Sequence, residues 1–104
     1  MGIVRFEQGD ILRVEKIRGP VLIVSKNFFH RTEQAIACPV AASAAPDPLH
    51  ILIDTGKTKG IVLCEHMRFL DLRIRGYQKI DEVPLSAVMD ITDAIQSIFD
   101  YYPG

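Results

Sequence analysis

The sequence carries almost no net charge, since 12 lysines and arginines stand against 13 aspartates and glutamates, a formal charge of −1 over 104 residues. A protein that binds nucleic acid through a broad electrostatic surface is usually clearly basic, so the composition argues against that class. A local basic groove remains compatible with it, because the distribution of charge matters more than the sum.

Cysteine is scarce as well. Cys38 and Cys64 lie in apolar runs and lack the spacing of metal ligands. We expect two buried, reduced thiols, and we expect neither a metal nor another cofactor.

No apolar run approaches the ~20 residues of a membrane span. Residues 1–8 lack the apolar core of a secretion signal. The sequence therefore predicts a cytoplasmic protein with no membrane partner.

Internal repeats, long linkers and low-complexity tracts are also missing. Hydrophobic residues make up 48% of the chain and charged residues 24%, which is the ordinary balance of a globular protein. A chain of this length fits one domain with one core. We therefore expect a single domain over residues 1–104.

Short apolar or alternating segments fill the first two thirds of the chain, and turn residues separate them. Residues 41–48 contain two prolines and small side chains, which predicts a loop. Pro39 indicates an edge strand or the end of a strand. The segments predict strands over residues 10–17, 21–24, 35–41, 49–53, 60–64, 68–74 and 76–80.

The spacing of apolar residues changes near the C-terminus. Pro84 suits the first turn of a helix, and apolar side chains then recur every three to four residues over residues 84–102. These side chains form one stripe: Leu85, Val88, Met89, Ile95, Ile98, Phe99 and Tyr102. Strands without intervening helices argue against a parallel sheet. We predict an α+β fold, mostly β: a small SH3-like barrel of bent antiparallel strands with a C-terminal helix.

Ionisable side chains are concentrated between residues 60 and 76. An apolar strand leads to Glu65, His66 and Arg68, and Arg73 and Arg75 follow within eleven residues. A carboxylate, an imidazole and three guanidiniums can hold a phosphodiester and move protons around it. Cleavage of a phosphodiester needs a base for the attacking hydroxyl, an acid for the leaving oxygen and cations over the phosphorus.

Each of these residues also has a structural interpretation. Glu65 is the natural base if burial raises its pKa, or else it forms an ion pair with Arg68 or Arg73. His66 is either the acid or a surface or packing histidine. Arg68 either clamps phosphate with its planar fork or pairs with a carboxylate.

Further candidates lie nearby. Arg73 and Arg75 alternate in a predicted strand, so they share one face, which is either an RNA-backbone strip or solvated surface. Phe28 and Phe29 stack on unpaired bases, or they pack under their loop or at a dimer interface. Two histidines show no ligand spacing and receive no role: His30 and His50.

Five motifs resemble, in order, those of the PemK/MazF toxins, which are small ribonucleases of toxin–antitoxin systems. Residues 9–11 (Gly-Asp-Ile) look like the opening G-[DE]-I of the family. Residues 19–25 and 37–40 are similar to its R-P-[AV]-L-I-V-S and V-P-[VI]-T-S strands. Residues 60–76 resemble the G-x-[VA]-x-[CA]-[DE]-Q-x-R-x-[IL]-D segment, and the terminal helix also corresponds.

The resemblance implies a barrel that forms a homodimer and cleaves single-stranded RNA sequence-selectively without metal. It also implies an antitoxin partner with a disordered tail that covers the RNA groove. Glu65 and Arg68 match the acidic and arginine positions of the family. The predicted function is therefore an endoribonuclease toxin of a toxin–antitoxin system.

The chain departs from the family at two positions that handle phosphate. Its first loop is shorter, Gly19 stands where the family has arginine, and Arg18 lies one place earlier. In a strand this slip turns a side chain to the other face unless a bulge compensates. Ala41 and Ala42 replace Thr-Ser, with Ser43 one or two places late. We predict catalysis by Glu65, Arg18 and Arg68, and RNA contacts by Lys16, Ser43, Arg73 and Arg75.

An alternative function follows from the same departures. The chain is then a binding module on the same fold with weak or no catalysis. It acts through an antitoxin or another protein target, as gyrase-poison toxins of similar fold do. The short first loop and Ala41–Ala42 favour this alternative, whereas Glu65 and Arg68 favour the enzyme. A solitary SH3-like adaptor is disfavoured, because no aromatic-lined groove for proline-rich peptides is evident.

Overall fold

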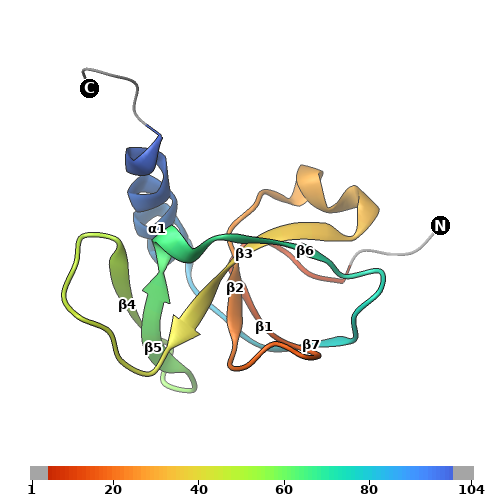
Figure 1. Cartoon of the computed structure of the whole chain (residues 1–104), viewed down its shortest axis with the longest axis horizontal. Helices are drawn as coiled ribbons and strands as arrows, with labels where there is room; N and C mark the ends of the chain where they lie inside the picture. The colour runs from red at the N-terminus through yellow and green to blue at the C-terminus, as the bar shows by residue number, and fades with distance from the viewer. Residues whose placement is uncertain (1–4, 100–104) are drawn as a thin grey trace.

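Strands make up most of the chain, and one helix follows them (Figure 1). The computed structural model describes residues 5–99. The strands are β1 (Asp10–Val14), β2 (Val21–Ile23), β3 (Gln34–Ala41), β4 (His50–Asp54), β5 (Lys59–Leu63), β6 (Arg68–Asp71) and β7 (Tyr77–Glu82). The helices are α1 (Leu85–Ile98) and the 3₁₀ turns η1 (Asn27–Thr32) and η2 (Cys64–His66). The predicted fold class is confirmed.

Strand β3 is the centre of the sheet. The strand order is β4-β5-β3-β2-β1-β7, and β6 also pairs with β3. All pairings are antiparallel. The C-terminal part of β3 pairs with β5, at Val40↔Val62, and its N-terminal part pairs with β6, at Ala37↔Arg68. One strand thus joins two half-sheets, and the sheet curls into the predicted barrel-like form (Figure 1).

Pro39 lies inside this central strand, so the prediction of an edge or terminal position was wrong. The N–H of Val40 donates to Pro20 O across β2, at 3.0 Å. The backbone of Pro39 therefore faces the opposite side, where β3 changes partner between β6 and β5. A proline lacks an N–H, and Pro39 lies between the residues of β3 that pair with β6 and those that pair with β5.

Two apolar clusters fill the two faces of the curled sheet. Residues of β1 and β2 alternate between them, with Ile11 and Leu22 in one cluster and Leu12 and Val21 in the other. This burial on both faces explains why β2 is entirely apolar. Helix α1 covers the first cluster, into which Ile91 projects. Cys38 and Cys64 are buried in this cluster as free thiols, as predicted.

Helix α1 begins after Pro84, in the extended N-cap conformation, and its described part ends at Ile98. The predicted extension to Tyr102 lies outside the described residues. The predicted stripe is not wholly a core stripe, because Val88 is buried while Leu85 and Met89 are exposed. No helix within residues 5–99 is long and apolar enough to cross a membrane.

Candidate functional site

Glu65 lies in the four-residue connection between β5 and β6. Strand β5 ends at Leu63, and the chain tightens into η2, whose first residue, Cys64, is buried. The N–H of Cys64 donates to Leu49 O at 3.0 Å, which joins η2 to the start of β4. Cys64 thus anchors η2 in the core and leaves Glu65 and His66 at the surface.

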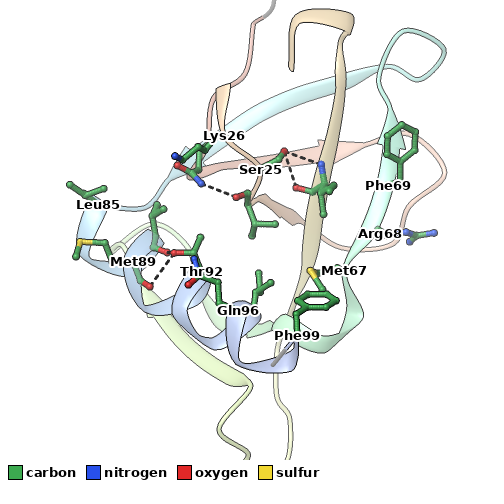
Figure 2. A pocket seen from close by; sticks show the side chains of 15 residues that line it. Ser25, Lys26, Met67, Arg68, Phe69, Leu85, Met89, Thr92, Gln96 and Phe99 are labelled. Carbon is green, nitrogen blue, oxygen red and sulfur yellow. Dashed lines mark hydrogen bonds between the residues drawn. The ribbon is translucent and has the colours of Figure 1, made fainter. Parts of the chain in front are cut away.

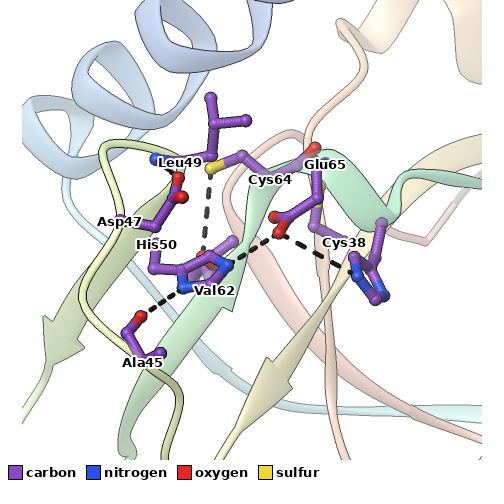
Figure 3. Close-up of polar contacts among 9 residues, drawn as sticks. Cys38, Ala45, Asp47, Leu49, His50, Val62, Cys64 and Glu65 are labelled. Carbon is purple, nitrogen blue, oxygen red and sulfur yellow. Dashed lines mark hydrogen bonds and ion pairs between the residues drawn. The ribbon is translucent and has the colours of Figure 1, made fainter.

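His50 is the direct partner of Glu65 (Figure 3). Its Nε2 lies 2.7 Å from Glu65 Oε2, and its Nδ1 lies 2.6 Å from Ala45 O. Both ring nitrogens face acceptors, so both contacts are hydrogen bonds only when both nitrogens carry protons. The Ala45 carbonyl, and then the Glu65 carboxylate, accordingly raise the pKa of His50. The geometry favours an imidazolium–carboxylate pair.

The electrostatics of Glu65 differ from our expectation. Burial was expected to raise its pKa, but its side chain is a third exposed. The hydrogen bond from His50 instead lowers the pKa of Glu65. The predicted structural alternative was wrong too, because the ion-pair partner of Glu65 is His50 rather than Arg68 or Arg73. Glu65 is therefore held in the ionised form.

His50 lacks metal-ligand spacing in the sequence, so no role was predicted for it. The signal lies in strand register. Strands β4 and β5 form a hairpin in which His50 pairs with Leu63, two residues before Glu65. A hairpin drawn between the two predicted strands, with its turn at residues 54–59, places His50 near the end of the second strand.

A second imidazole lies on the other side of the carboxylate. His66 Nε2 is 4.0 Å from Glu65 Oε2, and the His66 side chain is 60% exposed. Both histidines approach the same oxygen of Glu65. No group of three potential ligands among residues 5–99 is arranged to hold a metal ion. A carboxylate beside two imidazoles can exchange protons with a bound substrate.

Arg68 begins β6 and is exposed. No hydrogen bond or ion pair within the described part of the chain joins it to a carboxylate. It lines a groove next to η2 instead, where Figure 2 shows its side chain beside Phe69. Its guanidinium is available to an anion, and its catalytic role stays a prediction.

Arg73 and Arg75 follow the end of β6 at Asp71, so the prediction that they share a strand face was wrong. The chain turns here, and the Asp71 carboxylate accepts hydrogen bonds from Arg73 Nε at 2.9 Å and Nη2 at 2.7 Å. The Arg73 guanidinium thereby lowers the pKa of Asp71 to about 2. Arg73 is occupied, whereas Arg75 lies in the turn without such a partner among residues 5–99.

Three other predicted site residues lie outside η2 and β6. Lys16 and Arg18 are in the turn between β1 and β2, and Ser43 follows the end of β3. The turn lies at the level of Val40 in β3, because the N–H of Val40 donates to Pro20 O. The 3₁₀ turn η2 lies at the level of Cys38 in the same strand, because Cys64 O is 3.8 Å from Cys38 Sγ. Two to three residues of strand, roughly 7–10 Å, thus separate the turn from the level of η2. Figure 1 shows the two segments at different ends of the sheet.

The backbone of the turn explains the missing arginine. Gly19 has a φ of 75°, in the left-handed region that L side chains rarely adopt. An arginine at residue 19 would be strained, although a Cβ there would find space, 3.9 Å from Val40 O. The roles of Lys16, Arg18 and Ser43 stay predictions.

An open apolar groove runs between α1 and the segment from Met67 to Phe69 (Figure 2). Its volume is about 680 Å³. Three side chains of α1 and its C-cap are largely exposed on it, Leu85 at 71%, Met89 at 55% and Phe99 at 69%. Its charged lining residues are both cations: Lys26 and Arg68.

Comparisons with known proteins bear on the family and the fold of the chain. The family described as PemK-like, MazF-like toxin of type II toxin–antitoxin system matches residues 4–99. A comparison with curated proteins finds no match.

Solved structures share the fold. A MazE–MazF complex from Deinococcus radiodurans contains a chain 24% identical, with a TM-score of 0.82 over 93% of this chain and 97% of that one. An endoribonuclease in complex with its cognate antitoxin from Mycobacterial species is 19% identical, with a TM-score of 0.79 over 93% and 99%. The Mycobacterium tuberculosis toxin MazF-mt6 is 18% identical, with a TM-score of 0.69 over 88% and 97%.

Proposed function

Because the chain belongs to the family of PemK-like, MazF-like toxins of type II toxin–antitoxin systems, we propose that it is a cytoplasmic endoribonuclease. It cleaves single-stranded RNA without metal, by attack of a 2′-hydroxyl on the adjacent phosphodiester. One observation carries this proposal: the ionised carboxylate of Glu65 lies between two imidazoles, those of His50 and His66. A structural relative described as an endoribonuclease bound to its cognate antitoxin supports it.

Glu65 accepts the proton of the 2′-hydroxyl as the new bond from O2′ to phosphorus forms. A lower pKa makes it a weaker base but keeps it ionised at neutral pH. His66 donates a proton to the 5′-oxygen as the bond from phosphorus to that oxygen breaks. An imidazole suits this task near neutrality, and His66 is exposed beside the carboxylate. The products are a 2′,3′-cyclic phosphate and a free 5′-hydroxyl.

Cations stabilise the charge that develops on the phosphorane. Arg68 is the nearer candidate along the chain, and its planar fork suits two phosphate oxygens. Arg18 contributes if the substrate strand extends along β3 to the turn between β1 and β2. Lys16, Ser43 and Arg75 contact the RNA backbone or bases beyond the cleaved bond. Arg73 is a weaker candidate, because Asp71 already occupies its guanidinium.

Two protein partners complete the proposal. A homodimer covers the groove beside α1, since monomeric proteins rarely expose contiguous apolar patches of this kind. Leu85, Met89 and Phe99 are the side chains that such a contact buries. A cognate antitoxin is the inhibitor, and the MazE–MazF complexes among the structural relatives support this partner.

A second candidate function is a binding module with little or no catalysis. The groove favours it, because it is apolar, has a volume of about 680 Å³ and lies next to η2. Gly19 and Ala41–Ala42 at the positions of phosphate-handling residues favour it as well. In this case the antitoxin or another protein is the only ligand, and Glu65 and His50 form a structural ion pair.

The deciding experiment is cleavage of a long single-stranded RNA by the purified protein in EDTA, which removes the activity of contaminating metal-dependent nucleases. Glu65→Gln is the test variant. Asp93→Asn is its matched control, since Asp93 is an exposed carboxylate on α1. We expect site-selective cleavage by wild type and control, and its loss with Glu65→Gln. No cleavage by wild type, or equal cleavage by all three, would place the binding module first.

Arg18→Ala in the same assay tests the displaced arginine. If Arg18 has taken over the family's arginine role, cleavage falls as it does with Glu65→Gln. Unchanged cleavage would remove Arg18 from the site and leave Arg68 as the arginine to examine. Circular dichroism of each variant shows whether the loss reflects chemistry or folding.

A further inference from the structure

We propose that His50 is a positioning residue of the cleavage site, which fixes Oε2 of Glu65 and leaves Oε1 to receive the proton of the 2′-hydroxyl. This inference rests on the proposed function and extends it. His50 does not touch substrate in this scheme. It acts through the orientation and the charge of Glu65.

The geometry of the His50 ring carries the first step. His50 is the first residue of β4 and pairs with Leu63 of β5, so a strand ladder fixes its backbone. Its side chain is only 16% exposed. The Nδ1–H donates to Ala45 O at 2.6 Å, which sets the plane of the ring and aims Nε2 at Glu65 (Figure 3). Both nitrogens are occupied, so His50 has no free position for a substrate proton.

The hydrogen bond from His50 holds one oxygen of the Glu65 carboxylate. Both imidazoles meet Oε2, at 2.7 Å from His50 and 4.0 Å from His66. One oxygen of the carboxylate is therefore held from the protein side. No side chain among residues 5–99 is hydrogen-bonded to the other oxygen, and its direction is fixed, because rotation of the carboxylate breaks the 2.7 Å hydrogen bond. A base held in this way loses little rotational freedom when it meets the 2′-hydroxyl.

The charged groups around His50 favour its protonated form. Glu65 faces it from η2, and Asp47 faces it from the loop between β3 and β4. His66, on the far side of Glu65, shares the same carboxylate. The Ala45 carbonyl, and then these carboxylates, raise the pKa of His50, while the hydrogen bond from His50 lowers that of Glu65. The pair exists where His50 is protonated and Glu65 is ionised, and both pKa shifts widen that pH range.

The sign of the kinetic effect follows. The acidic limb of the pH profile of kcat/KM reports the proton that leaves the base of the free enzyme. His50 keeps Glu65 ionised down to lower pH, so its removal shifts this limb upward. A histidine that only ties the loop of Ala45 to η2 would change the stability of the protein without moving that limb.

The test compares His50→Gln with wild type and with Asp93→Asn. Glutamine has a side-chain N–H but no charge, and circular dichroism with a melting curve checks that the variant folds. Carbon-13 NMR of the side-chain carboxyls then follows the titration of Glu65, and RNA cleavage in EDTA gives kcat and KM against pH. The Glu65 titration shifts whenever the pair with His50 is broken, whereas the acidic limb stays in place if the pair is merely structural and Glu65 is not the base. His50→Asn replaces the glutamine variant if the latter does not fold.

We expect the Glu65 titration and the acidic limb to move together to higher pH in His50→Gln. We also expect kcat to fall roughly 10- to 100-fold with little change in KM, the loss typical of a misplaced catalytic group. Both readouts stay in place in Asp93→Asn. An unmoved Glu65 titration in His50→Gln overturns the inference, even if the variant is less stable.

The two proposals fail separately. If wild type cleaves no RNA, the proposed function fails while the Glu65 titration still decides whether His50 holds the carboxylate in its ionised form. A shifted titration then supports the pairing, and an unmoved one refutes it. If wild type cleaves RNA and His50→Gln retains its profile, the function stands and His50 has no part in it.

Discussion

Gly60 of β5 lies directly against Val40 of β3. A Cβ built on Gly60 would stand 2.7 Å from Val40 Cγ1 and 2.9 Å from Ala41 O. The second of these atoms belongs to the backbone and cannot rotate away. The absence of a side chain at residue 60 therefore lets the β3–β5 ladder close, and it is this ladder that carries the chain to η2.

The first prediction is that Gly60→Ala destabilises the protein by about 1–3 kcal/mol, the usual cost of overpacking. Urea unfolding followed by circular dichroism measures the free energy of unfolding. Gly76→Ala is the control, because its Cβ would meet the carboxylate of Glu15, the movable end of an exposed side chain. A smaller loss is expected there, and equal losses would contradict the packing argument.

A second prediction concerns the groove beside α1. Met89→Lys places a third cation next to Lys26 and Arg68 and removes an apolar contact. We expect the dimer dissociation constant to rise at least tenfold, which corresponds to about 1.4 kcal/mol. Sedimentation equilibrium measures it. Asp90→Lys adds the same side chain at the next residue, which is exposed but outside the groove. A wild-type monomer at high concentration would refute the proposed dimer surface.

The third prediction follows from His30, which is fully buried and contacts Ser25 Oγ through Nε2 at 2.7 Å. Its Nδ1 has no hydrogen-bond partner within residues 5–99. Burial lowers the pKa of His30, although Asp10 opposes this shift. The unfolded chain therefore binds a proton at about pH 6.5 that the folded chain resists. Stability should fall as the pH drops below that value, by at most about 1.4 kcal/mol per pH unit.

His50 has the opposite sign. Its pKa is raised, so its contribution is present below about pH 6.5 and is lost as the pH rises through the folded value. The two histidines thus act in neighbouring pH windows. Between pH 5 and 6.5, the free energy of unfolding of His30→Gln should change less with pH than that of wild type. A wild-type slope retained in the variant would show that another group is responsible.

The fourth prediction is that both thiols are inert in the folded protein. Burial raises the pKa of Cys38 to about 12 and that of Cys64 to about 11, so neither is a thiolate at pH 8. An aromatic disulfide reagent at pH 8 should label neither cysteine in native buffer. It should label both in about 6 M guanidinium, which unfolds the protein. Fast labelling of the native protein would mean that the core around η2 opens.

The sequence predicts the elements of this fold well, because their signals are local. The apolar run of β2 and the helical spacing after Pro84 each depend on neighbouring residues only. Pro39 was misplaced for the opposite reason. A proline reports a missing donor, but the exchange of β6 for β5 along β3 that makes the donor unnecessary depends on pairing between distant segments.

The site shows the same division. Glu65 was selected from a local cluster, and its cluster does lie at the surface. Its partner, His50, lies 15 residues away and reaches it through hairpin register, so spacing rules do not detect it. The predicted direction of the Glu65 pKa shift was wrong for that reason. Arg73 was expected on a strand, but the strand ends at Asp71. There the Arg73 guanidinium donates two hydrogen bonds to the Asp71 carboxylate.

The exchange of partners along β3 has a mechanical consequence. Strands β5 and β6 both pair with β3, and only four residues, including η2, connect them. Glu65 therefore sits on a short span fastened at both ends to one strand. Its position is set by the curvature of β3 rather than by the closing of a long loop. Any ligand that flattens or bends β3, from either face of the sheet, will tilt the carboxylate at a distance.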